Sequence, residues 1–436
     1  MKKLKKLIII ILLIIVIVSI LIIILGKLNQ KKEESNMSID DGEEIVQEKD
    51  ENGYVELSDY GLYYSINDIL SKYINIMTSN EVQDIEDESN KEYTDSSQNM
   101  DIIYSLLDKN YINNYNITVN NVEKFIYKLD DNAKIIPINI KIKYGENINT
   151  CIVNAYIMGN NIEEKKFIIR LDNKNETFSM EFINNDDVKE NNIDNEDRIK
   201  INDYNHFEIQ VATNEEIAMN YLEQYKNLVE RAPQIIYDNY LDDNYKKLRF
   251  ESLEEFKKYI ESNKEELELI RTNKYLCNDL GDGKAEYVCK DQYNNVYIFD
   301  INSIFDYKIK LDNYTILTDK FKTEYQNAND SKKIQMNTDR FIQMINRHDY
   351  KSSYNCISND FKNNYFSTEE EFVDFIKQHF FDYNNLSFKE FSKEGTNLFK
   401  YTISVEDLTE NDKDVKTVNM IMQINNDFDF EIAFEM

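Results

Sequence analysis

The chain has 436 residues, of which 12% are aromatic and 30% are charged, and its formal charge at pH 7 is −30. It contains no Trp, two Pro and nine Gly, but 31 Tyr and 23 Phe. Aromatic and branched side chains that recur with a regular period exclude a chain that is disordered throughout. The negative charge keeps an exposed protein soluble, and it argues against binding to nucleic acids because it repels their phosphates.

The N-terminal residues predict a membrane anchor. Four lysines lie among residues 2–6, and an apolar run from Leu7 to Leu25 follows, interrupted only by Ser19. As a helix such a run reaches about 28 Å, close to the hydrocarbon thickness of a bilayer. A cleavable signal peptide is the alternative, but its apolar region is shorter and ends at a small-residue site, whereas this one ends in Ile-Ile-Leu-Gly. We therefore expect residues 7–26 to form an uncleaved transmembrane helix.

The density of lysines before this run predicts its orientation. By the positive-inside rule, residues 1–6 are a cytoplasmic tail and the C-terminal body is extracellular. The abundance of Ile, Asn, Lys and Tyr is typical of an AT-rich bacterial genome, so the expected location is the cell membrane with the body at the cell surface. Breaks in composition then predict the remaining organisation: an acidic stalk at 27–57, α+β repeats at 58–186, 209–319 and 331–436, and linkers at 187–208 and 320–330.

The repeats are predicted from a shared pattern of apolar and aromatic positions. Four such positions at the same spacing occur in the third block (Phe361, Phe366, Phe372, Ile376) and in the second (Tyr245, Phe250, Phe256, Ile260), with a weaker copy in the first (Tyr111, Val122, Ile126) and a tyrosine upstream of each (Tyr104, Tyr237, Tyr354). Ser252 with Glu255, and Thr368 with Glu371, are capping boxes that predict a helix start. In the first block Thr118 can cap a helix, but Asn121 stands where the glutamate of a capping box would be.

Each block also opens with a helical pattern and closes with strands. Apolar spacings of three and four residues predict the opening helices (Leu62, Ile66, Ile69, Tyr73, Met77; Ile217, Tyr221, Tyr225, Leu228; Thr338, Phe341, Ile345). Alternation predicts antiparallel hairpins in the first and third blocks (Phe167, Ile169, Leu171 into Phe178, Met180, Phe182; Val418, Met420, Met422, Ile424 into Phe428, Phe430, Ile432, Phe434). The predicted fold class is α+β, with three helix-plus-curved-antiparallel-sheet domains in tandem.

This order of elements resembles the nuclear-transport-factor-2-like superfamily. The string FIQMINRHDYKSSYNCISNDFKNNYFSTEEEFVDFI, residues 341–376, is similar to the helical half of its cone-shaped domains. The resemblance implies a curved sheet and helices that enclose a pocket, and its enzymes use Asp, Tyr or His there, at positions that cannot be matched in this chain. Single-span bacterial proteins with such domains resemble envelope assembly factors, including conjugation-channel subunits.

Catalytic and metal-binding signatures are not found in the sequence. The three histidines, His206, His348 and His379, form no HxxxH or HExxH motif and are expected at the surface. There is no GxSxG and no glycine-rich phosphate loop. We therefore predict no catalytic, cofactor-binding or metal-binding residue, no cofactor, and a protein that is not an enzyme.

A local motif and the cysteines leave alternatives open. The segment from Asp279 to Glu286 has spaced carboxylates like a calcium loop, but a hairpin turn explains it better because the alternating ligands are missing. On paired strands Cys277 and Cys289 would lie close enough for a disulfide. Cys151 and Cys356 stand in apolar surroundings and are expected to be buried free thiols.

Two hypotheses for function remain. The first is a binding or scaffold protein, attached to the membrane through residues 7–26, that contacts an envelope protein or associates with itself. The second is a small-ligand receptor or enzyme that uses a cone-shaped pocket, which requires polar groups converging in a cavity. Bulky apolar residues on the last hairpin (Met420, Met422, Phe428, Phe430, Phe434) favour filled cones and argue against a small-molecule ligand.

Overall fold

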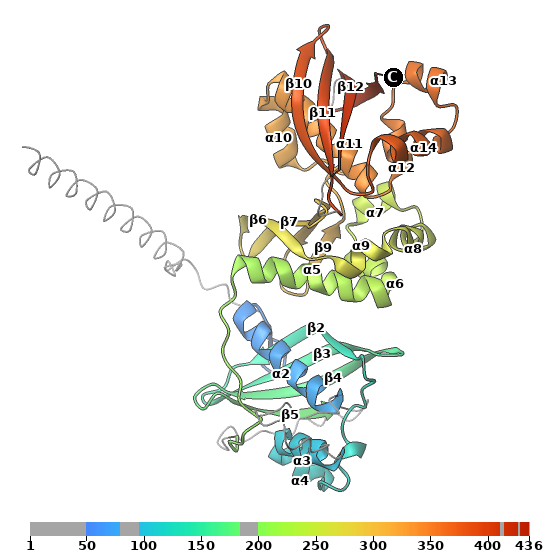
Figure 1. Cartoon of the computed structure of the whole chain (residues 1–436). Coiled ribbons are helices and arrows are strands. Elements are labelled where there is room, and N and C mark those ends of the chain that lie inside the picture. The colour runs from blue at the N-terminus through green and yellow to red at the C-terminus, as the bar shows by residue number, and fades with distance from the viewer. Residues whose placement is uncertain (1–48, 79–95, 184–198, 410–413, 426–427, 436) are drawn as a thin grey trace, which may run out of the picture. The chain divides into compact units, whose positions relative to one another are not determined.

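Three groups of helices, each followed by an antiparallel sheet, make up the part of the chain that the computed structural model describes, residues 49–78, 96–183, 199–409, 414–425 and 428–435 (Figure 1). The predicted anchor and most of the predicted stalk lie outside these residues. Among the helices that are described, none combines the length and the apolarity that a membrane span requires. The α+β class is confirmed.

The first group covers residues 55–183. Its elements are β1 (Val55–Glu56), α2 (Tyr60–Thr78), α3 (Ser96–Leu106), α4 (Lys109–Tyr115), the 3-10 turn η1 (Val122–Lys124), β2 (Lys134–Lys143), β3 (Ile148–Met158), β4 (Ile162–Asp172) and β5 (Thr177–Ile183). The strands lie in the sheet in their chain order, β1 to β5.

The second group covers residues 214–310. Its elements are α5 (Asn214–Arg231), α6 (Pro233–Ile235), the π-helical turn η2 (Ile236–Tyr240), α7 (Asp243–Arg249), α8 (Leu253–Ser262), α9 (Lys264–Leu269), β6 (Thr272–Gly281), β7 (Lys284–Asp291), β8 (Val296–Ile301) and β9 (Tyr307–Lys310). The sheet order is again the chain order.

The third group covers residues 319–434. Its elements are α10 (Asp319–Asn327), α11 (Asp330–Asn346), α12 (Tyr350–Asn355), α13 (Asn359–Tyr365), α14 (Glu369–His379), β10 (Asn384–Lys393), β11 (Leu398–Asp407), β12 (Val415–Ile424) and β13 (Phe430–Phe434). Helix α10 occupies a segment whose polar composition places most of it in a linker, and its Tyr325 is buried.

The long opening helices form where the apolar period predicts them, and each packs on the sheet of its own group (Figure 1). All the predicted core positions of α2, α5 and α11 are buried except Met77, which is half-buried near the end of α2. A capping box between Thr213 and Glu216 begins α5. Burial of these apolar stripes against the sheets provides most of the stability of such helices.

The repeated core positions are confirmed in the third group and in the second except for Ile260, the counterpart of Ile376, which is only half-buried while the neighbouring Tyr259 is buried. Phe256, Phe361, Phe372 and Ile376 are buried. Ser252 and Thr368 accept hydrogen bonds from the backbone N–H of Glu255 and Glu371, as predicted for N-caps. The capping boxes are incomplete, because the two glutamates accept from the N–H of Glu251 and Ser367, one residue before each cap. In the first group Val122 and Ile126 are buried, but they lie in and after the short turn η1 and not in an α-helix, since Asn121 provides no side-chain cap.

The first long strand of every sheet contains an unpaired extra residue, and β6 has a second one, Leu280, just before its turn. Ile138 in β2, Asn273 in β6 and Lys389 in β10 are each bypassed by the register of the neighbouring strand. A bulge of this kind bends the strand and increases its twist. These three bulges give the groups a common reference position, which is used below.

The last hairpin differs from the prediction at one residue. Strand β13 begins at Phe430, and Phe428 lies in the turn before it with φ +66°. A residue with φ in this region cannot continue the extended backbone, so Phe428 does not belong to the buried strand face. The rest of the face is as predicted, with Phe430, Ile432 and Phe434 buried.

From Glu56 onward the chain is one compact unit. The core of the second group includes Ile136 and Met158 from the first. The Oη atoms of Tyr60 and Tyr221 are 2.7 Å apart, and Nη1 of Arg231 donates to the carbonyl oxygen of Met158 at 2.8 Å. The groups are therefore joined by both apolar and polar contacts.

Candidate functional site

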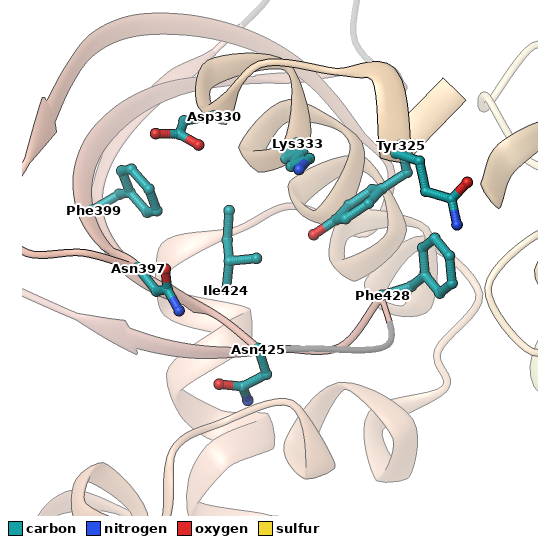
Figure 2. Close-up of a pocket in the computed structure, with 9 residues that line it drawn as sticks. Tyr325, Asp330, Lys333, Asn397, Phe399, Ile424, Asn425 and Phe428 are labelled. Atoms are coloured by element: carbon teal, nitrogen blue, oxygen red, sulfur yellow. The ribbon is translucent and has the colours of Figure 1, made fainter. Parts of the chain in front are cut away.

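A pocket of 420 Å³ in the third group is the candidate site (Figure 2). It lies where α10 and the first turns of α11 face the start of β11 and the end of β12. Its lining consists of aromatic rings, carboxamides, one ammonium and one carboxylate, with one aliphatic side chain (Tyr325, Gln326, Asp330, Lys333, Asn397, Phe399, Ile424, Asn425, Phe428).

Phe428 is held in its unusual backbone conformation by neighbouring groups. Its carbonyl oxygen accepts a hydrogen bond of 2.8 Å from Nη1 of Arg340, and its ring meets the ring of Tyr325 edge-on with centroids 5.5 Å apart. A bulky residue at positive φ is rare and persists only where its surroundings impose it. Arg340 is itself fixed on the face of Phe430, 5.1 Å from that ring.

Each charged side chain of the pocket contacts a neighbouring side chain. Lys333 Nζ lies 5.4 Å from the centroid of the Tyr325 ring, and Asp330 is paired with Lys393 at 2.7 Å. Burial raises the pKa of Tyr325, whose oxygen accepts a hydrogen bond from Asn337 at 3.0 Å. The phenol therefore stays neutral at physiological pH, and the pocket can offer hydrogen bonds to a polar ligand.

A second convergence of polar groups lies inside the second group, but it is closed. Arg347, which follows α11, has a fully buried side chain. Its Nη1 donates to Tyr259 Oη at 2.9 Å, to Tyr297 Oη at 3.1 Å and to Glu266 Oε1 at 3.3 Å. Its Nη2 donates to the carbonyl oxygen of Val296 at 3.1 Å. A residue of the third group thus fills the polar interior of the second.

Two carboxyl groups feel the charge of this buried guanidinium, and Glu266 forms an ion pair with it. Burial raises the pKa of Glu266 to about 8, although the charge of Arg347 lowers it, and burial also raises the pKa of Asp291. Asn295 donates to Glu266 Oε1, while Glu266 Oε2 has no hydrogen-bond partner within the described residues. A raised carboxyl pKa can indicate a catalytic acid, but here neither Glu266 nor Arg347 is open to solvent, so a structural role explains the shift.

A second ion pair joins the same two groups, with the arginine in the second group and the carboxylate in the third. Arg249 at the end of α7 lies 3.2 Å from Asp349, which caps α12 in the third group. Asp349 also accepts a hydrogen bond of 3.2 Å from Tyr314. The second and third groups thus each provide an arginine that pairs with a carboxylate of the other group. No motif in the sequence predicted either pair.

The histidines are distributed as single residues in different surroundings. His206 is exposed, as predicted. His348 is half-buried and not at the surface as predicted; it lies at φ +54°, and burial lowers its pKa. His379 stacks on Phe375 with ring centroids 4.1 Å apart. Within the ranges that the structure covers, no three His, Cys, Asp or Glu side chains are placed to hold a metal ion.

The segment from Asp279 to Glu286 is the predicted hairpin. Asp282 and Gly283 form its two-residue turn with φ +53° and +74°, the backbone that an Asp-Gly pair favours. The disulfide that the sequence leaves open is not formed, because both Cys277 and Cys289 are free. The register pairs Cys277 with Tyr287 and Cys289 with Tyr275, so the cysteines are diagonal neighbours. Diagonal positions are about 7–8 Å apart, which exceeds the Cα separation of a disulfide.

The remaining cysteines are free thiols. Cys151 is buried, as predicted, and burial raises its pKa to about 12. Cys356 is only partly buried, with its sulfur 3.8 Å from that of Met344.

No family model matches the chain, and neither a curated protein nor a solved structure matches it. Function must therefore be argued from the geometry alone.

Proposed function

We propose that this protein is a membrane-anchored extracytoplasmic scaffold whose body, residues 56–436, binds other proteins at the cell envelope without catalysing a reaction. The observation that carries the proposal is the filling of the interior of the second group by Arg347. In a receptor or enzyme of the cone-shaped class, that interior would be left open for the ligand.

The third group supports the same proposal. The inward positions of its last strands carry Met420, Met422 and Phe430, all buried, and they pack on Phe341 and Phe372. Side chains of this kind can neither donate nor accept a proton. The interior thus serves packing, and the surface is left for function.

Joined groups are what a scaffold requires. Hydrogen bonds and ion pairs link the second group to both of the others, through Tyr221, Arg231, Arg249 and Arg347. Surface patches on different groups are then presented to a partner together, which lowers the entropic cost of binding.

The fold and the location of the scaffold are part of the proposal. We propose that each group is a cone-shaped domain similar to the nuclear-transport-factor-2-like superfamily, because each has a long helix that packs on a bulged antiparallel sheet. We also propose that residues 7–25 anchor the chain, on the strength of their unbroken apolar run.

Crosslinking in living cells tests the scaffold directly. A photoreactive amino acid is placed at exposed apolar positions, singly at Leu248, Leu269 and Tyr275, and captured proteins are identified by mass spectrometry. We expect at least one position to capture the same envelope protein, or a second copy of this chain, reproducibly. A control at Glu254, an exposed charge, should capture less. Failure at every position would contradict the scaffold.

The pocket of the third group favours one alternative, a small-ligand receptor. Three amide side chains and Lys333 are among the residues that line its cavity of 420 Å³ (Figure 2). The test is thermal denaturation of the full chain with a library of polar metabolites. A stabilising compound whose effect is lost in Lys333→Met and kept in Lys389→Met would favour the receptor over the scaffold.

A further inference from the structure

The outer edge of the first strand of each sheet can be compared across the three groups. The bulges at Ile138, Asn273 and Lys389 align β2, β6 and β10. Two residues after each bulge stand Ile140, Tyr275 and Phe391, and their partners across the sheet are the buried residues Val153, Cys289 and Tyr401. Residues directly opposite each other share a face, so all three point to the helix side of their sheets.

In the first group this edge is covered by the chain itself. The extended segment that ends at Leu57 lies beside β2, and the backbone N–H of Leu57 donates to the carbonyl oxygen of Ile140 at 2.9 Å. Leu57 and Ile140 are both 0% exposed. The fold therefore accepts an extended segment with buried apolar side chains at this edge, since Tyr54 and Val55 are buried together with Leu57.

In the second group the same edge is open. Strand β6 is the outermost strand of its sheet, and no further described strand pairs with it. Tyr275, the counterpart of Ile140, is 40% exposed, and Leu276 and Leu280 on the same strand are also exposed. An unpaired edge with exposed apolar side chains is a template for another strand. The third group repeats this, with Phe391 45% exposed on the edge strand β10.

A groove runs beside the start of β6. It has a volume of 430 Å³, and its walls come from α5, from the residues that lead into β6, and from Tyr64 and Gln210. Met219, 50% exposed, and Leu222 supply apolar surface from α5, while Ile270 and Thr272 supply the strand side. A helix and an edge strand on either side of an apolar groove are the usual setting for β-strand addition.

We propose that the edge of β6, with the groove between it and α5, binds an extended segment of a basic protein partner as an added strand, with a bulky apolar side chain in the groove. This proposal rests on the scaffold function and names its surface and the chemistry of its partner. Main-chain hydrogen bonds to β6 provide the affinity, and the groove selects the apolar side chain.

Charge indicates that the strand bound at β6 comes from a different protein and not from a second copy of this chain. Glu216 and Glu223 line the groove with one cation, Arg271, and the whole chain carries −30. Two copies would repel each other on approach, whereas a segment with Lys or Arg beside its apolar residue would be attracted.

The covered edge of the first group supplies the probe. A fluorescent peptide of residues 53–59, GYVELSD, carrying Glu56→Lys and Asp59→Lys, is titrated against the full-length chain in detergent micelles and followed by fluorescence polarisation. We expect saturable binding that weakens as salt is raised. The same peptide with Leu57→Asn, at equal charge, should bind about tenfold more weakly, since one buried apolar side chain is lost. Equal binding of the two peptides would overturn the proposal.

Variants of the chain locate the site. Met219→Gln should weaken binding of the lysine peptide about tenfold, for the same reason. Leu248→Gln, also an exposed apolar residue on a helix of the second group, should leave binding unchanged. A photoreactive group at the Tyr54 position of the peptide should crosslink to α5 or β6. Crosslinks confined to other segments, or equal loss in both variants, would overturn the site.

The two proposals fail in different ways. A partner captured in cells from Leu248 or Leu269, together with a peptide that does not bind, would reject the β6 site and leave the scaffold standing. A peptide that binds as expected, with no partner captured from any position in cells, would support the β6 edge as a strand-binding site and reject the scaffold function.

Discussion

Arg347 shows how a single side chain can decide whether an interior is a site or a core. The desolvation of a buried charge costs several kcal/mol unless partners compensate it. Arg347 has four such partners in the second group, and its guanidinium also lies 4.4 Å from the centroid of the Tyr297 ring. These contacts fix the third group on the second, and the side chain of Arg347 fills the space that a cavity inside the second group would occupy.

The two carboxyls beside Arg347 predict a pH dependence. Glu266 has a pKa of about 8 in the folded chain, against an ordinary value of 4.5. Between these values the folded state holds a proton that the unfolded state has lost, so this group makes the free energy of unfolding fall as pH rises. Glu266→Gln imitates the protonated acid. It should match the wild type near pH 5 and be more stable than it at pH 8.5.

Urea denaturation at pH 5, 7 and 8.5 measures this difference. Glu268→Gln, on the same helix but exposed, is the matched control and should parallel the wild type at every pH. If the Glu266→Gln and wild-type curves were parallel as well, Glu266 would be ionised in the folded chain throughout this range.

At the scale of single elements, local signals predicted most of the structure. The helices α5 and α11 follow from apolar residues three and four apart, and the hairpin at Gly283 follows from an Asp-Gly pair, because neighbours along the chain determine both. Phe428 was misassigned because the alternation of apolar residues continues through a turn whose backbone depends on Arg340, a residue far away in the sequence.

Contacts between distant residues could not be predicted. Arg347 and Glu266 are 81 positions apart, and neither stands in a recognisable motif. Whether Cys277 and Cys289 are bonded could not be decided from the sequence, because an extra residue between Asp279 and Gly281 sets the register of β6 against β7 and leaves no mark on the alternation. The pocket around Phe428 depends on α10, whose polar sequence resembles a linker.

The helix α14 gives a direct test of the repeated core pattern. Phe372 is 0% exposed and packs among the rings of Tyr354 and Phe366, so Phe372→Ala should cost about 3–5 kcal/mol in the free energy of unfolding. Phe391→Ala in the same group is the control, because its ring is partly exposed. Chemical denaturation of the full chain measures both. A loss for Phe372→Ala no larger than for Phe391→Ala would contradict the buried role.

At the scale of the whole molecule, the third group is predicted to fold as a separate domain. A fragment of residues 319–436 keeps α10, whose Tyr325 contacts Asn337 and Phe428, whereas the fragment 331–436 lacks it. Both should unfold cooperatively, since a domain of this size can bury a sufficient core, and the longer one should have the higher melting temperature. Circular dichroism measures both. A disordered spectrum for 319–436 would contradict the separate domain.

The predicted anchor determines where the scaffold works. If the apolar run from Leu7 to Leu25 lies in the membrane and the lysines before it in the cytoplasm, as proposed, the whole body is outside and accessible to protease. Trypsin added to intact protoplasts should digest the body and spare a small N-terminal fragment, detected through an N-terminal epitope tag, while a cytoplasmic marker protein stays intact. Replacing Leu13 and Ile14 by Arg should release the chain from the membrane fraction, because charges at the centre of a span oppose insertion. If trypsin digested the body only after lysis, the body would lie in the cytoplasm, which would contradict the proposed function at the cell envelope.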